Sequence, residues 1–218
     1  MKGLLIKDFR LMKNQKTFLV IIGFIAAMLL VTTDNPSFVI CYVTILFSMF
    51  AVTTLSYDEY DNGSAFLFSL PLKRKTYVME KYIFSLLLGG IAWAVITLLS
   101  TACLYFRLPE ENIEEYLLSA VIYFGILLIF TTLILPMQFK FGAEKGRIAI
   151  LGFVGIVFIL VFIGSKLLKP MGIDLDAVIS EISKVKPVQV VIWLFVSSLV
   201  LLCVSYMISV KIMEKKEF

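Results

Sequence analysis

Long uncharged runs separate short clusters of charged residues along the chain. A helix needs about 20 apolar residues to cross the hydrocarbon core of a bilayer, and six runs without Asp, Glu, Lys or Arg are about this long. Their hydrophobicity is continuous rather than alternating, which excludes the strands of a membrane barrel. The pattern predicts an all-α polytopic membrane protein in one domain, 1–218, with six transmembrane helices at about 17–33, 36–57, 82–106, 116–138, 148–166 and 187–210.

Basic residues gather on one side of this predicted membrane. Of the 20 Lys and Arg residues, fifteen lie in the N-terminal tail, the loops after the second and fourth spans, and the C-terminal tail. Cytoplasmic flanks of membrane helices carry an excess of Lys and Arg. Both termini are therefore expected in the cytoplasm of a bacterial cell, with the spans in its inner (plasma) membrane.

The N-terminal tail has the pattern of an amphipathic helix. Leu5, Phe9 and Met12 recur at helical spacing, with Lys and Arg around them. Such a helix lies in the headgroup region of an anionic leaflet, so we expect an interfacial helix ahead of the first span. A simple cytoplasmic anchor would explain the charges equally well.

Composition limits the chemistry that the chain can carry out. It is 60% hydrophobic, has a net charge of +4 and contains no histidine, which removes histidine-based nucleophiles and histidine metal sites. The glycine-rich loop that cradles nucleotide phosphates is also missing. The three cysteines fall inside predicted spans and are expected to pack there. We expect no catalytic or metal-binding residues, no enzyme activity, no cofactor in this chain and no binding of nucleic acid.

The uncharged runs also bear on the source of energy. Transporters driven by protons or ions usually carry ionisable residues within the membrane, because those groups couple the ion to the cargo. The six runs contain none. A transporter of this kind would need work delivered by a separate protein through a cytosolic loop.

Residues 57–81 form the cytosolic loop best suited to that contact. Its middle, Ala65–Phe68, is apolar, and charged residues lie on both sides of it. This arrangement predicts an amphipathic segment at the membrane surface. Pro71 would end any helix ahead of it, because its ring clashes with the preceding turn and it has no backbone N–H.

Residues 57–81 resemble the signature region of ABC type-2 permeases. In that family an acidic residue and a glycine precede a short cytosolic helix, and a Leu-Pro-hydrophobic-x-Arg stretch then leads to a Lys before the third span. The matching residues here are Asp58-Glu59, Gly63, Leu70-Pro71-Leu72, Arg74 and Lys81. The six-span layout, the cytoplasmic ends and the amphipathic N-terminal helix are also similar, so the resemblance covers the whole chain.

The resemblance implies that the helix between spans two and three is a coupling helix. It would fit a cleft on a cytosolic ABC ATPase subunit, which would bind ATP and Mg. Phe66 and Phe68 would be apolar anchors, while Arg74 and Lys75 would steer towards or pair with acidic residues of the ATPase. The residues expected to couple to the ATPase are Glu59, Gly63, Phe66, Phe68, Leu70, Pro71, Arg74, Lys75 and Lys81.

The expected partners follow from the same resemblance. Six helices are too few to enclose a wide path, so a second permease copy, identical or a sister, would complete it within the membrane lipid. The small size resembles compact exporters of amphipathic peptides, such as phenol-soluble modulin and bacteriocin exporters. An exporter of antibiotics or lipids, and a non-transporting assembly or sensory subunit, are the alternatives.

Three local features give further expectations. Gly89-Gly90 in the third span should permit close helix packing. The fourth span should kink or stop near Pro136. Residues 166–186 contain apolar positions at three- and four-residue spacing, which predicts an amphipathic helix on the outer face.

Overall fold

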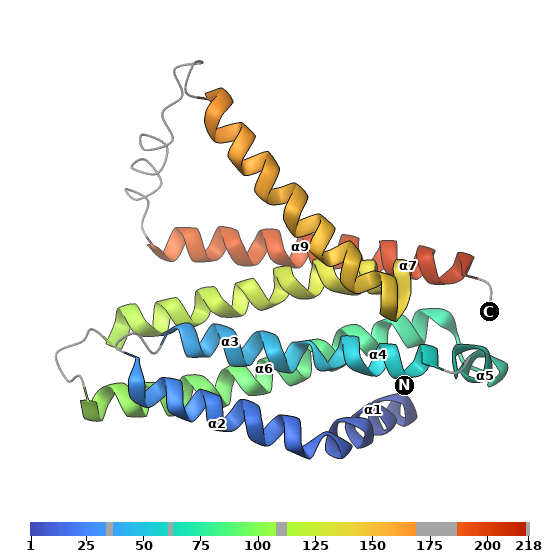
Figure 1. Ribbon diagram of the computed structural model, residues 1–218, viewed down its shortest axis with the longest axis horizontal. Helices are drawn as coiled ribbons and strands as arrows, with labels where there is room; N and C mark the ends of the chain where they lie inside the picture. Colours follow the sequence, from blue (N-terminus) through green and yellow to red (C-terminus); the bar gives the residue numbers. More distant parts are fainter. Residues whose placement is uncertain (34–36, 61–62, 108–112, 169–186, 217–218) are drawn as a thin grey trace.

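A computed structural model describes residues 1–33, 37–60, 63–107, 113–168 and 187–216, and every regular element in this part of the chain is a helix (Figure 1). The predicted outer helix at 166–186 lies almost wholly outside the described residues. In chain order the helices are α1 (Lys2–Asn14), α2 (Lys16–Thr32), α3 (Ser37–Ser48), α4 (Phe50–Glu59), α5 (Gly63–Ser69), α6 (Arg74–Arg107), α7 (Ile113–Leu168) and α9 (Pro187–Lys215).

Four helical stretches among the described residues are long and apolar enough to cross a membrane: Ser37–Glu59, Arg74–Phe106, Ile113–Gly142 and Pro187–Lys215. A fifth is possible if α1 and α2, which meet at a bend of 70°, are counted as one broken span. The fold is therefore a multi-pass helical bundle. Six complete spans remain a prediction, because 148–166 is not among these stretches.

The break after the fourth predicted span lies further along than its proline suggested. The helix continues through Pro136, and the non-helical backbone is at Gly142, where φ is +76°. Only glycine adopts such an angle without strain. Beyond Gly142 the second limb of α7 turns back and leans away from the bundle (Figure 1).

Hydroxyl groups connect the helices inside the bundle. Ser48 of α3 and Ser85 of α6 form a hydrogen bond of 2.7 Å, and Thr131 of α7 lies 3.4 Å from both. Nearby, the Tyr82 hydroxyl contacts Ser205 and Ser209 of α9 at 2.6 and 2.8 Å. Interhelical hydrogen bonds of this kind support packing where water is absent. The interior is thus more polar than the uncharged runs indicate.

Small residues bring the helices close together at two places. A Cβ atom added at Gly89 of α6 would lie 2.7 Å from a methyl group of Leu127 on α7. One added at Gly125 of α7 would lie 1.7 Å from Leu194 on α9. The predicted close approach at Gly89 is therefore present.

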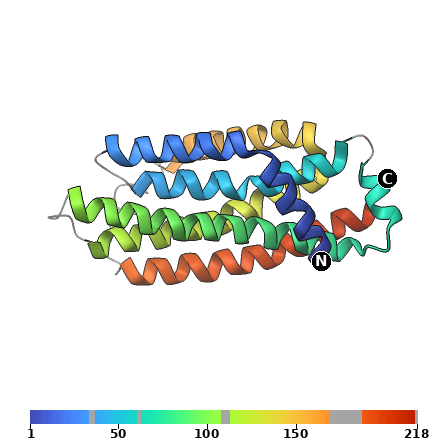
Figure 2. The ribbon, with the colours of Figure 1, turned by 90° about the horizontal axis from the view of Figure 1, so that it is seen from below.

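The N-terminus, α5 and the last turn of α9 lie at the same end of the bundle (Figures 1 and 2). We call this the charged end. There α1 crosses obliquely over the neighbouring helices rather than extending away from them (Figure 2). Its apolar face packs on protein: Leu4 is buried, and Leu5, Phe9 and Met12 contact the core.

Candidate coupling site

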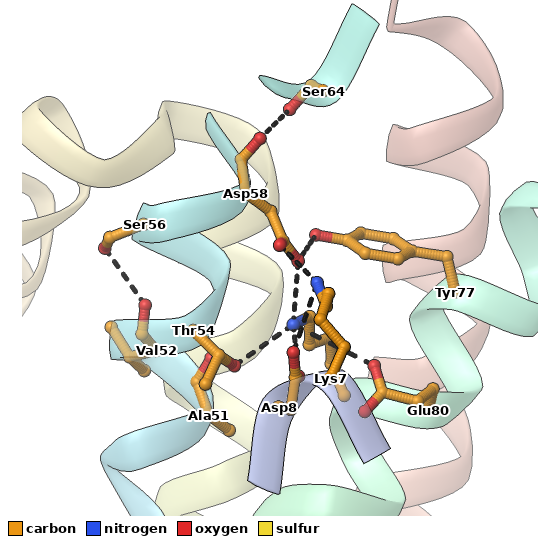
Figure 3. A network of polar contacts seen from close by, with 11 residues as sticks. Lys7, Asp8, Ala51, Val52, Thr54, Ser56, Asp58, Ser64, Tyr77 and Glu80 are labelled. Atoms are coloured by element: carbon orange, nitrogen blue, oxygen red, sulfur yellow. Dashed lines mark hydrogen bonds and ion pairs between the residues drawn. The ribbon is translucent and has the colours of Figure 1, made fainter. Parts of the chain in front are cut away.

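Ionisable side chains from three helices meet inside the charged end. Asp8 comes from α1 and Asp58 from the last turn of α4 (Figure 3). Lys81 comes from α6 and contacts both. Asp8, Glu80 and Lys81 are 0% exposed. We call the group the ion cluster, and its members are Lys7, Asp8, Asp58, Tyr77, Glu80 and Lys81.

Lys81 lies at the centre of the ion cluster. Its ammonium nitrogen is 2.5 Å from Asp8 Oδ2, 2.9 Å from Asp58 Oδ2 and 3.0 Å from Thr54 Oγ1. An ammonium group has three hydrogen-bond donors. These three oxygens, which come from α1 and α4, therefore account for its full capacity and fix both helices against α6.

Asp58 is the second hub of the cluster. Its carboxylate also binds the ammonium group of Lys7 and accepts a hydrogen bond of 2.9 Å from the Tyr77 hydroxyl. Three donors from α1 and α6 thus converge on one carboxylate. Charge-assisted hydrogen bonds are the stronger class, and removing one partner from such a buried set is costly.

Glu80 differs from the other members because neither of its carboxyl oxygens has a hydrogen-bond partner among the described residues. Its nearest cation is Lys81, at 3.9 Å. The cluster brings together three carboxyl groups and two ammonium groups. If all were ionised, it would carry one uncompensated negative charge away from water.

The ion cluster corrects the expectation that the membrane helices lack ionisable groups. The uncharged runs themselves are free of charge, but the helices continue past them. Asp58 therefore lies in α4 and Glu80 and Lys81 lie in α6, all buried at the charged end. Lys81 was expected to couple to a partner, yet its ammonium group is wholly engaged within this chain.

Asp58 also connects the ion cluster to α5. Its backbone carbonyl accepts a hydrogen bond of 3.0 Å from the Ser64 hydroxyl in the first turn of α5 (Figure 3). A Cβ atom at Gly63 would lie 2.9 Å from the same carbonyl oxygen, so a larger residue would push α5 away. One residue thereby links α5 to α4, α6 and α1.

The short helix α5 presents its two phenylalanines in opposite ways. Phe66 is 72% exposed, whereas Phe68 packs edge-to-face on Tyr77 with ring centroids 5.4 Å apart. The helix ends at Ser69, just before Leu70 and Pro71, both of which are exposed. Phe66 is therefore available to a partner, and Phe68 holds α5 to the bundle.

The basic residues after α5 bind the end of α9. Arg74 Nη1 donates hydrogen bonds of 2.7–2.9 Å to the backbone carbonyls of Met213, Glu214 and Lys216. The last carbonyls of a helix lack partners within it, and a guanidinium group satisfies them well. Arg74 therefore caps α9 within this chain.

Two ion pairs extend this connection. Lys75 lies 3.7 Å from Glu214, in an exposed pair. Glu59 lies 2.8 Å from Lys216, and a Cβ atom at Gly142 would approach the Glu59 carboxylate to 3.0 Å. Every residue expected to couple to a partner thus lies at the charged end, although only some of them face outwards.

A scan against protein-family models matches residues 3–214 to the ABC-2 family transporter proteins. The chain belongs to this family. Searches of curated proteins and of solved structures gave no match. Membership of the ABC-2 family agrees with the resemblance noted in the sequence and makes the chain a multi-pass membrane component of a transporter.

Sequence reasoning for this ABC-2 family chain missed Lys7, Asp8, Tyr77 and Glu80. Spacing offered a partial signal, because Thr54 and Asp58, like Tyr77 and Lys81, are four residues apart and share a helix face. No spacing within one helix shows that two such faces meet. Among the described residues, no three His, Cys, Asp or Glu side chains could hold a metal ion.

Proposed function

We propose that the chain is the membrane-spanning permease subunit of an ATP-driven exporter. A separate cytosolic ATPase subunit would bind ATP and Mg, and α5 would receive its motion. The observation that carries this proposal is the arrangement of α5, in which Phe66 is 72% exposed while Asp58 ties the helix to the ion cluster. Membership of the ABC-2 family supports it.

The contacts of Asp58 define a route for that motion. A push on Phe66 reaches the first turn of α5, and Ser64 there is bonded to the Asp58 carbonyl. The Asp58 carboxylate in turn forms ion pairs with Lys7 of α1 and Lys81 of α6. Because the contact between Asp58 and Lys81 is buried and charge-assisted, α5 and the three helices would move as a unit. The Lys and Arg residues there support a cytosolic location for the charged end, by the positive-inside rule.

We propose hydrophobic or amphipathic peptides as the cargo, moved out of the cell by two permease copies. Large apolar side chains dominate the faces of α2, α6 and α9, and few charges lie on them. A peptide with an apolar face would partition onto such surfaces from the membrane. Peptide-stimulated ATP hydrolysis by the reconstituted complex separates this cargo from antibiotics and lipids, each added in turn. A sensory subunit would give no stimulation by any of them.

The coupling role of α5 can be tested with two substitutions of one residue. Phe66→Glu places a charge on the exposed anchor, and Phe66→Leu keeps an apolar side chain there as the matched control. In coexpression with the ATPase from the same operon, we expect Phe66→Glu to lose copurification of the ATPase and cargo-stimulated hydrolysis. Phe66→Leu should retain both.

The exposed position makes this test cleaner than a change at Phe68, whose ring packs on Tyr77. Substitution of an exposed residue changes the free energy of unfolding by only about 0.5 kcal/mol. Membrane insertion and unfolding midpoint should therefore be unchanged in both variants. Full copurification of the ATPase with Phe66→Glu would show that α5 is not the contact.

A further inference from the structure

An apolar groove runs along the bundle between α2 and α6. Leu19, Gly23 and Leu30 line it on α2, Leu88 and Leu99 line it on α6, and α3 contributes to its lining at Val43 and Phe47. Its volume is about 430 Å³, within the range of about 300–1,000 Å³ typical of ligand sites. Over its whole length α2 buries only Ile22 and Ala26.

The length of the groove matches one leaflet of a bilayer. On α2 it extends from Leu19 to Leu30, and on α6 from Leu88 to Leu99. At 1.5 Å per residue, each stretch is roughly 16 Å long. The hydrocarbon core is about 30 Å thick, so the groove spans about half of it. A transmembrane helix of a second copy would need a groove about twice as long.

The lining of the groove favours a hydrocarbon chain. Every residue that lines it is apolar, so no lining side chain offers a strong hydrogen-bonding group. A single acyl chain needs none.

Positive charge lies at one end of the groove. Phe9 and Met12 of α1 line this end. Lys13 follows Phe9 by four residues, and Lys16 precedes Gly23 by seven, so both project near the groove by helical periodicity. Both side chains are exposed, and neither belongs to the ion cluster.

We propose that the groove binds one acyl chain of an anionic phospholipid from the leaflet next to α1. The phosphate of its headgroup lies at Lys13 and Lys16, and the chain runs towards Leu30 and Leu99. The lipid fills the space that α2 leaves open and fastens α2 to α6. This site does not depend on the proposed transport function.

Native mass spectrometry of the full chain, titrated with phosphatidylglycerol or phosphatidylcholine, tests the headgroup. We expect one phosphatidylglycerol to be retained more tightly than phosphatidylcholine. Lys13→Gln combined with Lys16→Gln should weaken the binding of phosphatidylglycerol about 30-fold. This factor corresponds to the usual attraction of two basic residues to an anionic lipid surface. Lys211→Gln with Lys215→Gln removes the same charge from exposed positions on α9 and should leave the preference intact.

The groove itself is tested by filling it. Gly23→Phe should abolish retention of the tightly held lipid, because a Cβ atom at Gly23 meets no atom within 4 Å and the ring can occupy the groove. Val20→Phe, at a position 70% exposed and outside the groove, is the control. Ala27→Phe fills the groove elsewhere if Gly23→Phe does not fold.

Four results would overturn the proposal. Equal affinity for the two lipids in the unmodified chain would exclude the headgroup site. Undiminished retention of phosphatidylglycerol in both groove-filling variants would exclude the groove. A shift in the monomer–dimer distribution of the groove-filling variants, with unchanged lipid retention, would make the groove a contact between copies. Displacement of the lipid by an added amphipathic peptide alone would make the groove a cargo site.

Discussion

Replacing Lys81 with methionine would remove the centre of the ion cluster while keeping most of the side-chain volume. The ammonium group lies 2.5–3.0 Å from Asp8, Asp58 and Thr54 and is 0% exposed. Its loss would leave two buried carboxylates with only Lys7 as a counter-ion. Breaking a buried ion pair by removing one partner costs about 3–5 kcal/mol. We expect Lys81→Met to lower the free energy of unfolding by this amount.

Lys75→Met is the matched control, because it makes the same chemical change on the same helix. The Lys75 side chain is 67% exposed and lies 3.7 Å from Glu214. Exposed pairs contribute about 0–1 kcal/mol, so this variant should be nearly neutral. Reversible unfolding of the purified chain in mixed micelles would measure both. Equal midpoints for the two variants would refute the view that the ion cluster holds the charged end together.

A double-mutant cycle adds a second readout. If Asp8 and Lys81 interact directly, removal of both as Asp8→Leu and Lys81→Met should cost less than the sum of the single changes. Coupling energies between contacting residues are about 0.5–3 kcal/mol. Strict additivity would mean that the two side chains contribute independently to stability. That result would contradict a direct interaction at the 2.5 Å distance between Lys81 Nζ and Asp8 Oδ2.

Two further predictions concern single residues at the charged end. Gly142→Ala should destabilise the protein by about 1–3 kcal/mol, because its backbone (φ +76°, ψ −177°) lies in a region that essentially only glycine adopts. Gly152→Ala, where an added Cβ atom meets no atom within 4 Å, should be neutral or slightly stabilising. Both are measured by the unfolding midpoint. Glu80→Gln should leave stability nearly unchanged, because burial without a hydrogen-bond donor among the described residues favours the neutral carboxyl group, which the amide resembles in size and charge. A loss of several kcal/mol in Glu80→Gln, measured in the same way, would show that the carboxylate charge is needed.

The helices could be predicted from the sequence, but where they break could not be. Runs without charge identify helices that fit a membrane, since each is about as long as the hydrocarbon core is thick. Pro136 seemed to end one of them. It is tolerated within α7, and the helix breaks instead at Gly142, which faces the Glu59 carboxylate. The contact between Gly142 and Glu59 joins residues far apart in the sequence, so no local sequence pattern predicts it.

That residues 57–81 couple to a partner stays a prediction, but the structure shows how their side chains are arranged. Phe66 and Phe68 were both expected to anchor an ATPase, and Arg74, Lys75 and Lys81 to couple to it. The structure separates them, because Phe66 points outwards, Arg74 caps α9, and Lys81 is fully buried. The hydrophobic pattern cannot distinguish a Lys that reaches water from one that meets two carboxylates. Only the packing of α1 and α4 against α6 decides it.

The contact of Arg74 with the end of α9 also constrains the order in which the protein can assemble. The carbonyl groups that it binds lie 139–142 residues further along the chain. While the ribosome is still making α7, α6 is already in the membrane but these acceptors do not yet exist. The charged end therefore reaches its final form only after the last helix has been inserted, and nascent chains lacking α9 should present an altered surface to any cytosolic subunit.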